Sequence, residues 1–385
     1  MDLTAPAIAE EERFDPPSKI TTIATHLATQ IKNGSHFIVF TGAGISTSTG
    51  IPDFRGPEGA WTKRAQGKQL AFKPNTTLQA IPSPTHMALV ALQDRGLLQY
   101  VVSQNCDGLH RRSGIRPDRI AELHGNSNLE YCMACGKEYL RDFRAVARYE
   151  KSWADHRTGR KCAVPGCGGA LRDSIVNFGE GLPGQAFADA ERHARMADCC
   201  LVLGSSCRVT PANEIPEIVG AKGRGKKKAG LAICNLQSTP LDGAAALRVY
   251  ARTDELMISI MQKLDIPIPR FVLRRRLVVE VVSQAADRHQ VKVGGLDVDG
   301  TPVSFLKSVR LVGSRRAART EPFVISTRET LGLGEDIKLE LEFFGHYGEP
   351  DLVVRHEYTG GKEGRKVYLL EYDPMVREWR IGEEE

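Results

Sequence analysis

Two close pairs of cysteines impose the strongest constraint on how this chain can fold. Cys132 and Cys135 are separated by two residues, and Cys162 and Cys167 follow after about 26 more. Two knuckle turns that each present two thiolates are typical of a zinc ribbon with tetrahedral coordination. Four protein ligands leave no open position on the metal, so the sequence predicts a structural zinc module at about 126–176. The alternative is four unrelated free thiols.

The other cysteines lie in or beside apolar segments and are expected to be mostly buried and inert. These are Cys106, Cys199, Cys200, Cys207 and Cys234. The sequence has nine cysteines, an odd number, and its acidic start lacks the apolar core of a secretory signal. Both features favour a reduced compartment over a framework of disulfide bonds. No apolar run approaches the ~20 residues of a membrane span, so no membrane association is expected.

Short apolar runs alternate with helical periodicity between residues 35 and 270. The strand-like runs are "HFIVF", "LQYVVSQN", "CCLVLGSS" and "LAICNL", and the helices include "PTHMALVALQDRG" and "GQAFADAERHARMAD". Such alternation predicts an α/β domain with a Rossmann-like parallel sheet, interrupted by the zinc-ribbon module. Residues 1–34 are predicted to form an acidic tail and an amphipathic helix, "ITTIATHLATQIKN".

The pattern changes after residue 270. Segments such as "LRRRLVVEVVSQ", "DIKLELEFFGHY" and "KVYLLEY" alternate apolar and polar residues, with Gly, Asp and Pro between them. This alternation predicts a C-terminal all-β, sandwich-like domain over residues 271–385. The net charge of +5 is mild, but residues 221–230, 274–276 and 314–319 are basic. They are candidates for non-specific contact with nucleic acid or nucleosomes, and a solvated surface is the alternative for residues 221–230.

A glycine turn follows the first strand-like run, in "VFTGAGISTSTGIPDFRG". Gly42 and Gly44 allow close approach of the backbone to a phosphate, and N–H groups at a following helix start favour anions. The third glycine of the usual dinucleotide motif is replaced by Thr47, and Pro52 stops the helix early. Residues 53–56 are therefore expected to form a loop that covers a ligand. The alternative is a structural loop in which the arginine pairs with the aspartate.

Polar residues also follow the other predicted strands. Gln104, Asn105 and Asp107 lie after "YVVS", "ELHGN" contains His124, "LVLGSS" ends in Gly204, Ser205 and Ser206, and "ICNLQ" contains Asn235 and Gln237. In open parallel sheets the carboxyl ends of the strands form one ligand-binding crevice, so these residues are expected to meet. His110 competes with His124 as a functional histidine, but its helical context favours a packing or surface role.

The ordered motifs resemble the sirtuin family of NAD-dependent protein lysine deacylases. The resemblance rests on "TGAGISTSTGIPDFRG", "SQNCDGLH", "ELHGN", "LGSS" and "NLQ", with the four-cysteine module between the third and the fourth, and it covers roughly residues 14–265. Details such as "FDPP", "TGRKC", "LRDSIVNFGE" and "NLQSTP" resemble the class IV, nuclear branch. The resemblance does not extend to the C-terminal β region.

The resemblance implies a set of roles for individual residues. NAD would be bound through its phosphates, riboses, nicotinamide and adenine by Ala43, Gly44, Thr47, Asp53, Phe54, Arg55, Trp61, Gln104, Gly204, Ser205, Ser206, Asn235, Gln237 and Thr253. His124 would be the general base, with Asn105 and Asp107 beside the nicotinamide pocket. An acylated lysine peptide would lie extended between residues 178–180 and residues 205–209.

The implied reaction consumes NAD rather than reducing it. The acyl-lysine oxygen would attack the ribose as nicotinamide leaves, and an imidazole with a pKa near neutrality suits the following proton removal. The products would be deacylated lysine and O-acyl-ADP-ribose, and the resemblance implies a nuclear enzyme acting on proteins such as histones. The alternatives are protein mono-ADP-ribosyl transfer, or a chromatin-binding scaffold with weak catalysis. A hydride-transferring dehydrogenase is disfavoured because the segment after Gly44 departs from the dinucleotide spacing.

Overall fold

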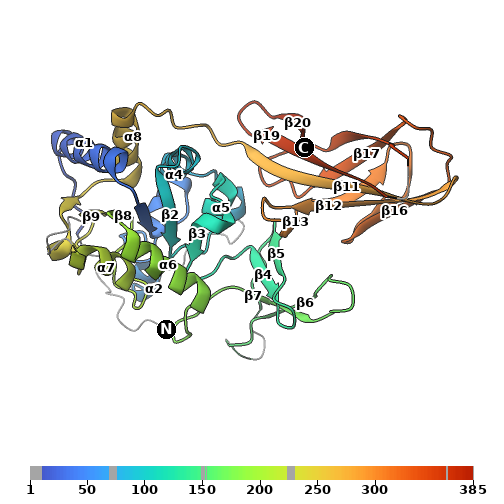
Figure 1. The fold of residues 1–385 in the computed structure, drawn as a ribbon. Helices are drawn as coiled ribbons and strands as arrows, with labels where there is room; N and C mark the ends of the chain where they lie inside the picture. The colour runs from blue at the N-terminus through green and yellow to red at the C-terminus, as the bar shows by residue number, and fades with distance from the viewer. Residues whose placement is uncertain are drawn as a thin grey trace. The chain divides into compact units, whose positions relative to one another are not determined.

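The computed structural model describes residues 11–68, 76–148, 152, 154–222, 230–360 and 363–384. The chain divides into two compact units (Figure 1). Unit 1 contains residues 1–127 and 174–271, and unit 2 contains residues 128–173 and 272–385. Among the described helices, none has the length and apolar character needed to cross a membrane.

Unit 1 is built on a six-stranded sheet with the order β10-β9-β8-β1-β2-β3. All of its neighbouring strands are parallel, which confirms the predicted Rossmann-like sheet. The strands are β1 (Phe37–Thr41), β2 (Leu98–Ser103), β3 (Ile120–Glu122), β8 (Cys199–Leu203), β9 (Gly230–Cys234) and β10 (Leu247–Val249). The sheet order reverses direction between β1 and β8, where ligands bind in open α/β sheets.

Helices cover both faces of this sheet, which explains why its central strands are apolar throughout rather than alternating. Phe37 and Val39 of β1 belong to the same buried cluster as α1, α4 and α8. Ile38 and Phe40 belong to the cluster that contains α6 and α7. The helices are α1 (Pro17–Asn33), α2 (Ala60–Ala65), α3 (Thr76–Gln79), α4 (Pro84–Asp94), α5 (Leu109–Ser113), α6 (Gly184–Met196), α7 (Glu214–Lys222) and α8 (Thr253–Leu264).

Unit 2 combines the four-cysteine segment with the C-terminal strands. Strands β4 (Leu129–Cys132), β5 (Glu138–Arg141), β6 (Arg157–Lys161) and β7 (Ala170–Asp173) form the cysteine module. The C-terminal strands are β11 (Leu273–Ala285), β12 (Arg288–Leu296), β13 (Pro302–Ser304), β14 (Leu306–Leu311), β15 (Ala317–Ala318), β16 (Phe323–Thr327), β17 (Asp336–Phe343), β18 (Leu352–Glu357), β19 (Glu363–Asp373) and β20 (Glu378–Glu384).

The C-terminal strands form a two-layer arrangement, as the alternating pattern predicts. One sheet has the order β20-β19-β11-β12-β13 and continues through β5 into the cysteine module, while β15-β14-β17-β18 form a second sheet. Val279, Val291 and Tyr368 of the first sheet share a buried cluster with Leu339 and Val354 of the second. The cysteine module, expected inside the α/β region at about 126–176, thus shares a sheet with the β domain.

The basic segment of residues 274–276 is neutralised by acidic partners. Arg274 pairs with Glu371 at 2.9 Å, Arg275 with Asp142 at 2.7 Å, and Arg276 with a glutamate of β20 at 2.5 Å. These side chains are therefore engaged within unit 2, which weakens their candidacy as phosphate contacts. Most of the other basic loop, residues 223–229, lies outside the described residues.

Candidate active site

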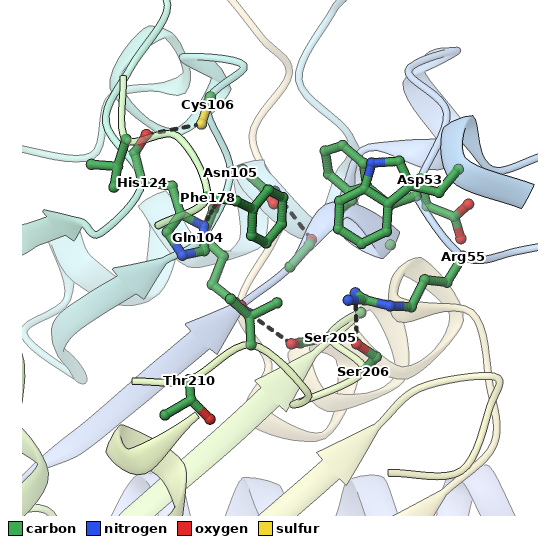
Figure 2. A pocket seen from close by; sticks show the side chains of 18 of the residues that line it. Asp53, Arg55, Gln104, Asn105, Cys106, His124, Phe178, Ser205, Ser206 and Thr210 are labelled. Atoms are coloured by element: carbon green, nitrogen blue, oxygen red, sulfur yellow. Dashed lines mark hydrogen bonds between the residues drawn. The ribbon is translucent and has the colours of Figure 1, made fainter. Parts of the chain in front are cut away.

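A cleft of about 300 Å³ lies at the carboxyl ends of the parallel strands in unit 1. Its wall is formed by the segments that follow β1, β2, β8 and β9, together with the loops around residues 53–61, 124 and 176–182. Figure 2 shows side chains from these separate segments converging on the cleft. The predicted residues that line it are Ala43, Gly44, Asp53, Phe54, Arg55, Trp61, Gln104, Asn105, His124, Gly204, Ser205, Ser206, Asn235 and Gln237.

The glycine turn is required by a close approach of two backbones. A Cβ atom on Gly44 would lie 2.7 Å from the Cα atom of Gly204, and one on Gly42 would lie 2.6 Å from the Gly204 carbonyl oxygen. Gly204 itself has a φ of +62°, in the left-handed region that favours glycine. The turn continues as two short 3₁₀ segments, Ala43–Ile45 and Thr47–Thr49, and not as a long helix. The Gly44 N–H donates to the Gly204 carbonyl oxygen at 2.9 Å, whereas the Ala43 N–H has no hydrogen-bond partner among the described residues.

The ring of His124 is held in one orientation by a hydrogen bond to the main chain of Gln104. Its Nδ1 atom lies 3.0 Å from the carbonyl oxygen of Gln104. A carbonyl can only accept, so Nδ1 carries the proton in the neutral ring and Nε2 keeps a free lone pair. Burial lowers the pKa of His124, and the hydrogen bond to Gln104 opposes that shift in part. The ring is therefore set up to accept a proton at Nε2.

The backbone around His124 is fixed by two further contacts. The carbonyl oxygen of His124 accepts from the Val176 N–H at 3.1 Å. It also accepts from the Cys106 thiol at 3.2 Å (Figure 2). The next residue, Gly125, has a φ of +79°, and a Cβ there would lie 1.9 Å from the Ser174 carbonyl oxygen. Only glycine fits at this position, which explains the "HG" pair in the sequence.

Side-chain amides join the ends of neighbouring strands. Gln104 donates through Nε2 to the Ser205 hydroxyl at 2.7 Å, which connects the end of β2 to the end of β8. Asn105 donates through Nδ2 to the Gly42 carbonyl oxygen at 3.1 Å. The amide side chains therefore brace the glycine turn and the serine segment against the strand that positions His124.

An aromatic and cationic wall comes from the loop after the glycine turn. The Arg55 guanidinium lies 4.5 Å from the Trp61 ring centroid and donates to the Ser206 hydroxyl at 3.3 Å. Trp61 also packs against Phe54 at 4.9 Å and Phe178 at 5.4 Å between ring centroids. Both phenylalanines are about half exposed, at 46% and 49%. Exposed aromatic rings that line a cleft are available for contact with a ligand.

Asp53 has a structural role as well as a place in the cleft wall. Its carboxylate accepts from the Gly56 N–H at 3.0 Å, which closes the turn of the loop. Burial raises the pKa of Asp53, whereas the Gly56 N–H and the Arg55 charge oppose that shift.

Three predicted residues lie outside the lining of the cleft. The Asp107 carboxylate accepts from the Ser46 hydroxyl at 2.7 Å and the Leu109 N–H at 2.9 Å, behind the glycine turn. Thr47 is exposed and caps the Gly44 carbonyl oxygen. Thr253 is buried at the start of α8, where its hydroxyl accepts from Thr85. Asp107 and Thr47 therefore stabilise the conformation of the glycine turn.

Sequence reasoning missed several residues that line the cleft. These are Cys106, Val176, Asn177, Leu182, Thr210 and Pro211. Cys106 lies between two predicted residues and is partly exposed, unlike the buried Cys199, Cys200, Cys207 and Cys234. The position of Cys106 in "QNCDG", between the predicted residues Asn105 and Asp107, could have indicated that it lines the cleft.

Two buried histidines lie next to the glycine turn. His110 pairs through Nε2 with the Thr41 hydroxyl at 2.9 Å, and His86 pairs through Nδ1 with the Ser83 hydroxyl at 2.8 Å. Their rings are 5.0 Å apart, and among the described residues the other nitrogen of each ring has no hydrogen-bond partner. Burial lowers the pKa of His86 to about 4 and, with the neighbouring His86, that of His110 to about 3. His110 therefore packs as a neutral residue and does not rival His124.

The four cysteines of unit 2 converge as the spacing predicts. The Sγ atoms of Cys132, Cys135, Cys162 and Cys167 all lie within 4.8 Å of one another. Two of the Sγ pairs are 3.6 Å apart, close to the edge of about 3.8 Å that bonds of ~2.3 Å give a tetrahedral Zn²⁺ site. The donor set fits a structural zinc ion.

Comparison with known proteins gives consistent matches. The Sir2 family model matches residues 69–211. The NAD-dependent protein deacetylase SRT1 of Arabidopsis thaliana is 44% identical over 306 residues, which are 78% of this chain and 62% of that protein. The NAD-dependent protein deacetylase Sirt6 of Drosophila melanogaster is 35% identical over 267 residues, which are 68% of this chain and 81% of that protein.

An archaeal relative is covered almost completely. An NAD-dependent protein deacetylase of Sulfolobus acidocaldarius is 37% identical over 257 residues, which are 63% of this chain and 95% of that protein. The matches with the two plant SRT1 proteins, in contrast, span only 62% and 61% of their lengths.

Proposed function

Because this chain belongs to the Sir2 family, we propose that it is an NAD-dependent protein lysine deacetylase. The observation that carries the proposal is His124, whose Nδ1 is committed to the Gln104 carbonyl oxygen while the ring lines a cleft built on a glycine turn. NAD-dependent deacetylation needs both a base that acts near neutral pH and a turn that binds the phosphates, within one crevice.

The dinucleotide would lie along the cleft with its phosphates at the glycine turn. The Ala43 N–H and the Ser205 hydroxyl are the donors at that point, and helix and turn N-termini favour such anions. Asn235 and Gln237, which line the cleft beyond β9, would hold the adenine-side ribose. Arg55, Phe54 and Trp61 would cover the nicotinamide side.

The chain's own residues would then direct the chemistry. Bound NAD supplies a cleavable bond between ribose and nicotinamide, and a ribose that receives the acyl group. Nε2 of His124 would take the proton from a ribose hydroxyl. General-base catalysis of this kind typically raises the reaction rate by about 10²–10⁴-fold. Asn105 would orient the nicotinamide side, and the aromatic wall of Phe54, Trp61 and Phe178 would exclude water.

The peptide substrate would enter beside the serine segment. Residues 178–180 and Val209 line the cleft from opposite loops, and an extended peptide between them would pair through main-chain hydrogen bonds. We extend the proposal to a nuclear location and to acylated histones, which the class IV motifs in the sequence support. The zinc ion has no open coordination position and would serve structure alone.

The test is a product analysis with purified, zinc-loaded protein. NAD is incubated with acetyl-lysine peptides of histone and non-histone sequence, and mass spectrometry follows nicotinamide, deacetylated peptide and O-acetyl-ADP-ribose. Equal amounts of the three products support the proposal. Transfer of ADP-ribose to protein without O-acetyl-ADP-ribose would show mono-ADP-ribosyl transfer instead. No NAD cleavage with any peptide would favour the scaffold function.

A further inference from the structure

The cysteine module and the C-terminal β domain are joined by a continuous hydrogen-bonded sheet within unit 2. Strands β5 and β13 are neighbours in this sheet (Figure 1). They pair in parallel, with Leu140 opposite Val303 and Arg141 opposite Ser304. The Asp142 N–H extends the ladder by donating to the Ser304 carbonyl oxygen at 2.8 Å. The two segments are more than a hundred residues apart in the sequence, so this seam is a tertiary contact.

Arg141 is the centre of a buried polar cluster at this seam. Its guanidinium contacts the Glu130 carboxylate of the module at 2.7 Å. It also contacts two groups of the β domain, the Ser304 hydroxyl at 2.5 Å and the Glu321 carboxylate at 3.0 Å. Glu130 is 0% exposed and Arg141 is 8% exposed. Removing one partner from such a buried cluster leaves an uncompensated polar group, so the cluster requires both segments.

The same cluster reaches the metal-binding cysteines. Tyr139 precedes Arg141 by two residues on β5, on the same face of the strand, and its hydroxyl lies 3.1 Å from the Cys162 Sγ atom. The Arg141 guanidinium lies 4.9 Å from the Tyr139 ring centroid. On β4, Glu130 and the ligand Cys132 are related by the same two-residue step. The metal site and the seam are therefore neighbours on both strands.

A second set of contacts holds the end of β5. The Asp142 carboxylate pairs with Arg275 of β11 at 2.7 Å, and its carbonyl oxygen lies 2.5 Å from Nε2 of His346. Phe143 packs against Phe344 with ring centroids 5.8 Å apart. The β domain thus contacts three consecutive residues of the module, from Arg141 onward.

We propose that the zinc site and the C-terminal β domain are one cooperative unit, coupled through Arg141 and the β5–β13 seam. Metal binding to small cysteine modules supplies folding free energy, and here the strand that it orders is the strand on which the β domain is paired. Loss of zinc therefore loosens the β domain, and damage to the β-domain side of the seam speeds the loss of zinc. The coupling lies within unit 2 and requires no catalytic activity.

The first test removes the metal from the full-length chain. Zinc is stripped with a chelator under reducing conditions, and hydrogen exchange is measured by mass spectrometry. We expect exchange to rise at least about tenfold in the module and in β13 and the adjoining part of β12. The sheet of unit 1 serves as the internal reference. Faster exchange in residues 129–173 with no change in residues 272–385 would overturn the proposal.

The second test perturbs the β-domain side and measures the metal. Ser304→Ala removes a buried partner of Arg141, and Ser308→Ala, which loses a hydroxyl bonded to Glu342 of β17, is the matched control. Zinc release to a colorimetric chelator should be about tenfold faster in Ser304→Ala and unchanged in Ser308→Ala. Should Ser304→Ala fail to fold, Glu321→Gln replaces it, because it removes the charge of the other β-domain partner of Arg141. Equal release rates in the variant and the control would refute the coupling.

Discussion

Gln104 fixes the tautomer of His124 through its main chain and braces Ser205 through its side chain. The carbonyl oxygen of Gln104 lies 3.0 Å from Nδ1 of His124, and its amide nitrogen lies 2.7 Å from the Ser205 hydroxyl. One residue at the end of β2 therefore sets both the proton-accepting atom and the serine segment across the cleft.

Replacing His124 should remove the chemical step and leave cofactor binding intact. In His124→Gln the lone pair at Nε2 is lost, so kcat should fall by about 10²–10⁴-fold. Affinity for NAD, measured by calorimetry, should change little because the glycine turn is untouched. His26→Gln, at an exposed position of α1, is the control. A kcat within about fivefold of the parent would exclude His124 as the base.

The pH–rate profile should report the lowered pKa of His124. The base acts in its neutral form, and burial favours that form. The midpoint of the acidic limb of kcat/KM should therefore lie below pH 6.5, because the ordinary pKa of histidine is about 6.5. Circular dichroism at each pH would separate titration from unfolding. A limb centred above pH 7 would contradict the assignment.

Gly44→Ala should destabilise the fold and weaken NAD binding together. The added Cβ would lie 2.7 Å from the Gly204 Cα atom, and backbone at that distance has to move. Overpacking of this kind typically costs about 1–3 kcal/mol of unfolding free energy. The matched control is Gly184→Ala at the start of α6. A Cβ atom added there has no atom within 4 Å outside its chain neighbours and its own helix backbone. Urea unfolding and NAD titration of both variants check the prediction.

The buried pair His86 and His110 should make the fold sensitive to acid. Their pKa values are lowered in the folded state to about 4 and about 3, so the unfolded chain binds more protons below pH 6.5. Their stabilising contribution is complete above pH 6.5 and is lost progressively as the pH falls through 4 toward 3. Asp254 and Asp107, which face the pair, oppose this shift.

Urea unfolding between pH 7 and pH 5, where few carboxyl groups titrate, measures this acid sensitivity. His86→Gln should flatten the dependence of the unfolding free energy on pH, and His26→Gln should leave it unchanged. A parent protein whose stability is constant across that range would rule out the effect.

The sequence predicted the parts of the fold that local pattern determines. Apolar runs identified β1, β2, β8 and β9, because strands covered on both faces are apolar throughout. Strands β3 and β10 escaped prediction because each has three residues at a sheet edge. Strand β20 was not among the predicted strands, since its pattern is mostly charged and exposed.

Long-range pairing was beyond prediction from the sequence. Nothing local to "EYLR" indicates that β5 pairs with β13, because the pairing is chosen by partners such as Ser304 and Arg275 far along the chain. The same holds for Asp107, whose carboxylate turns to Ser46 behind the glycine turn and not to the cleft. The residues at the strand ends were predictable because parallel strands bring their carboxyl ends to one edge.

The Ser205 hydroxyl has a further consequence for what the crevice selects. It already accepts from the Gln104 amide at 2.7 Å and from the Cys207 N–H at 3.2 Å, so both of its lone pairs are engaged. Its single hydrogen is the group left to point outward, and an occupant at that spot has to offer an electron pair. A phosphate or sugar oxygen satisfies the hydroxyl, whereas an ammonium or amide N–H placed there would meet no acceptor.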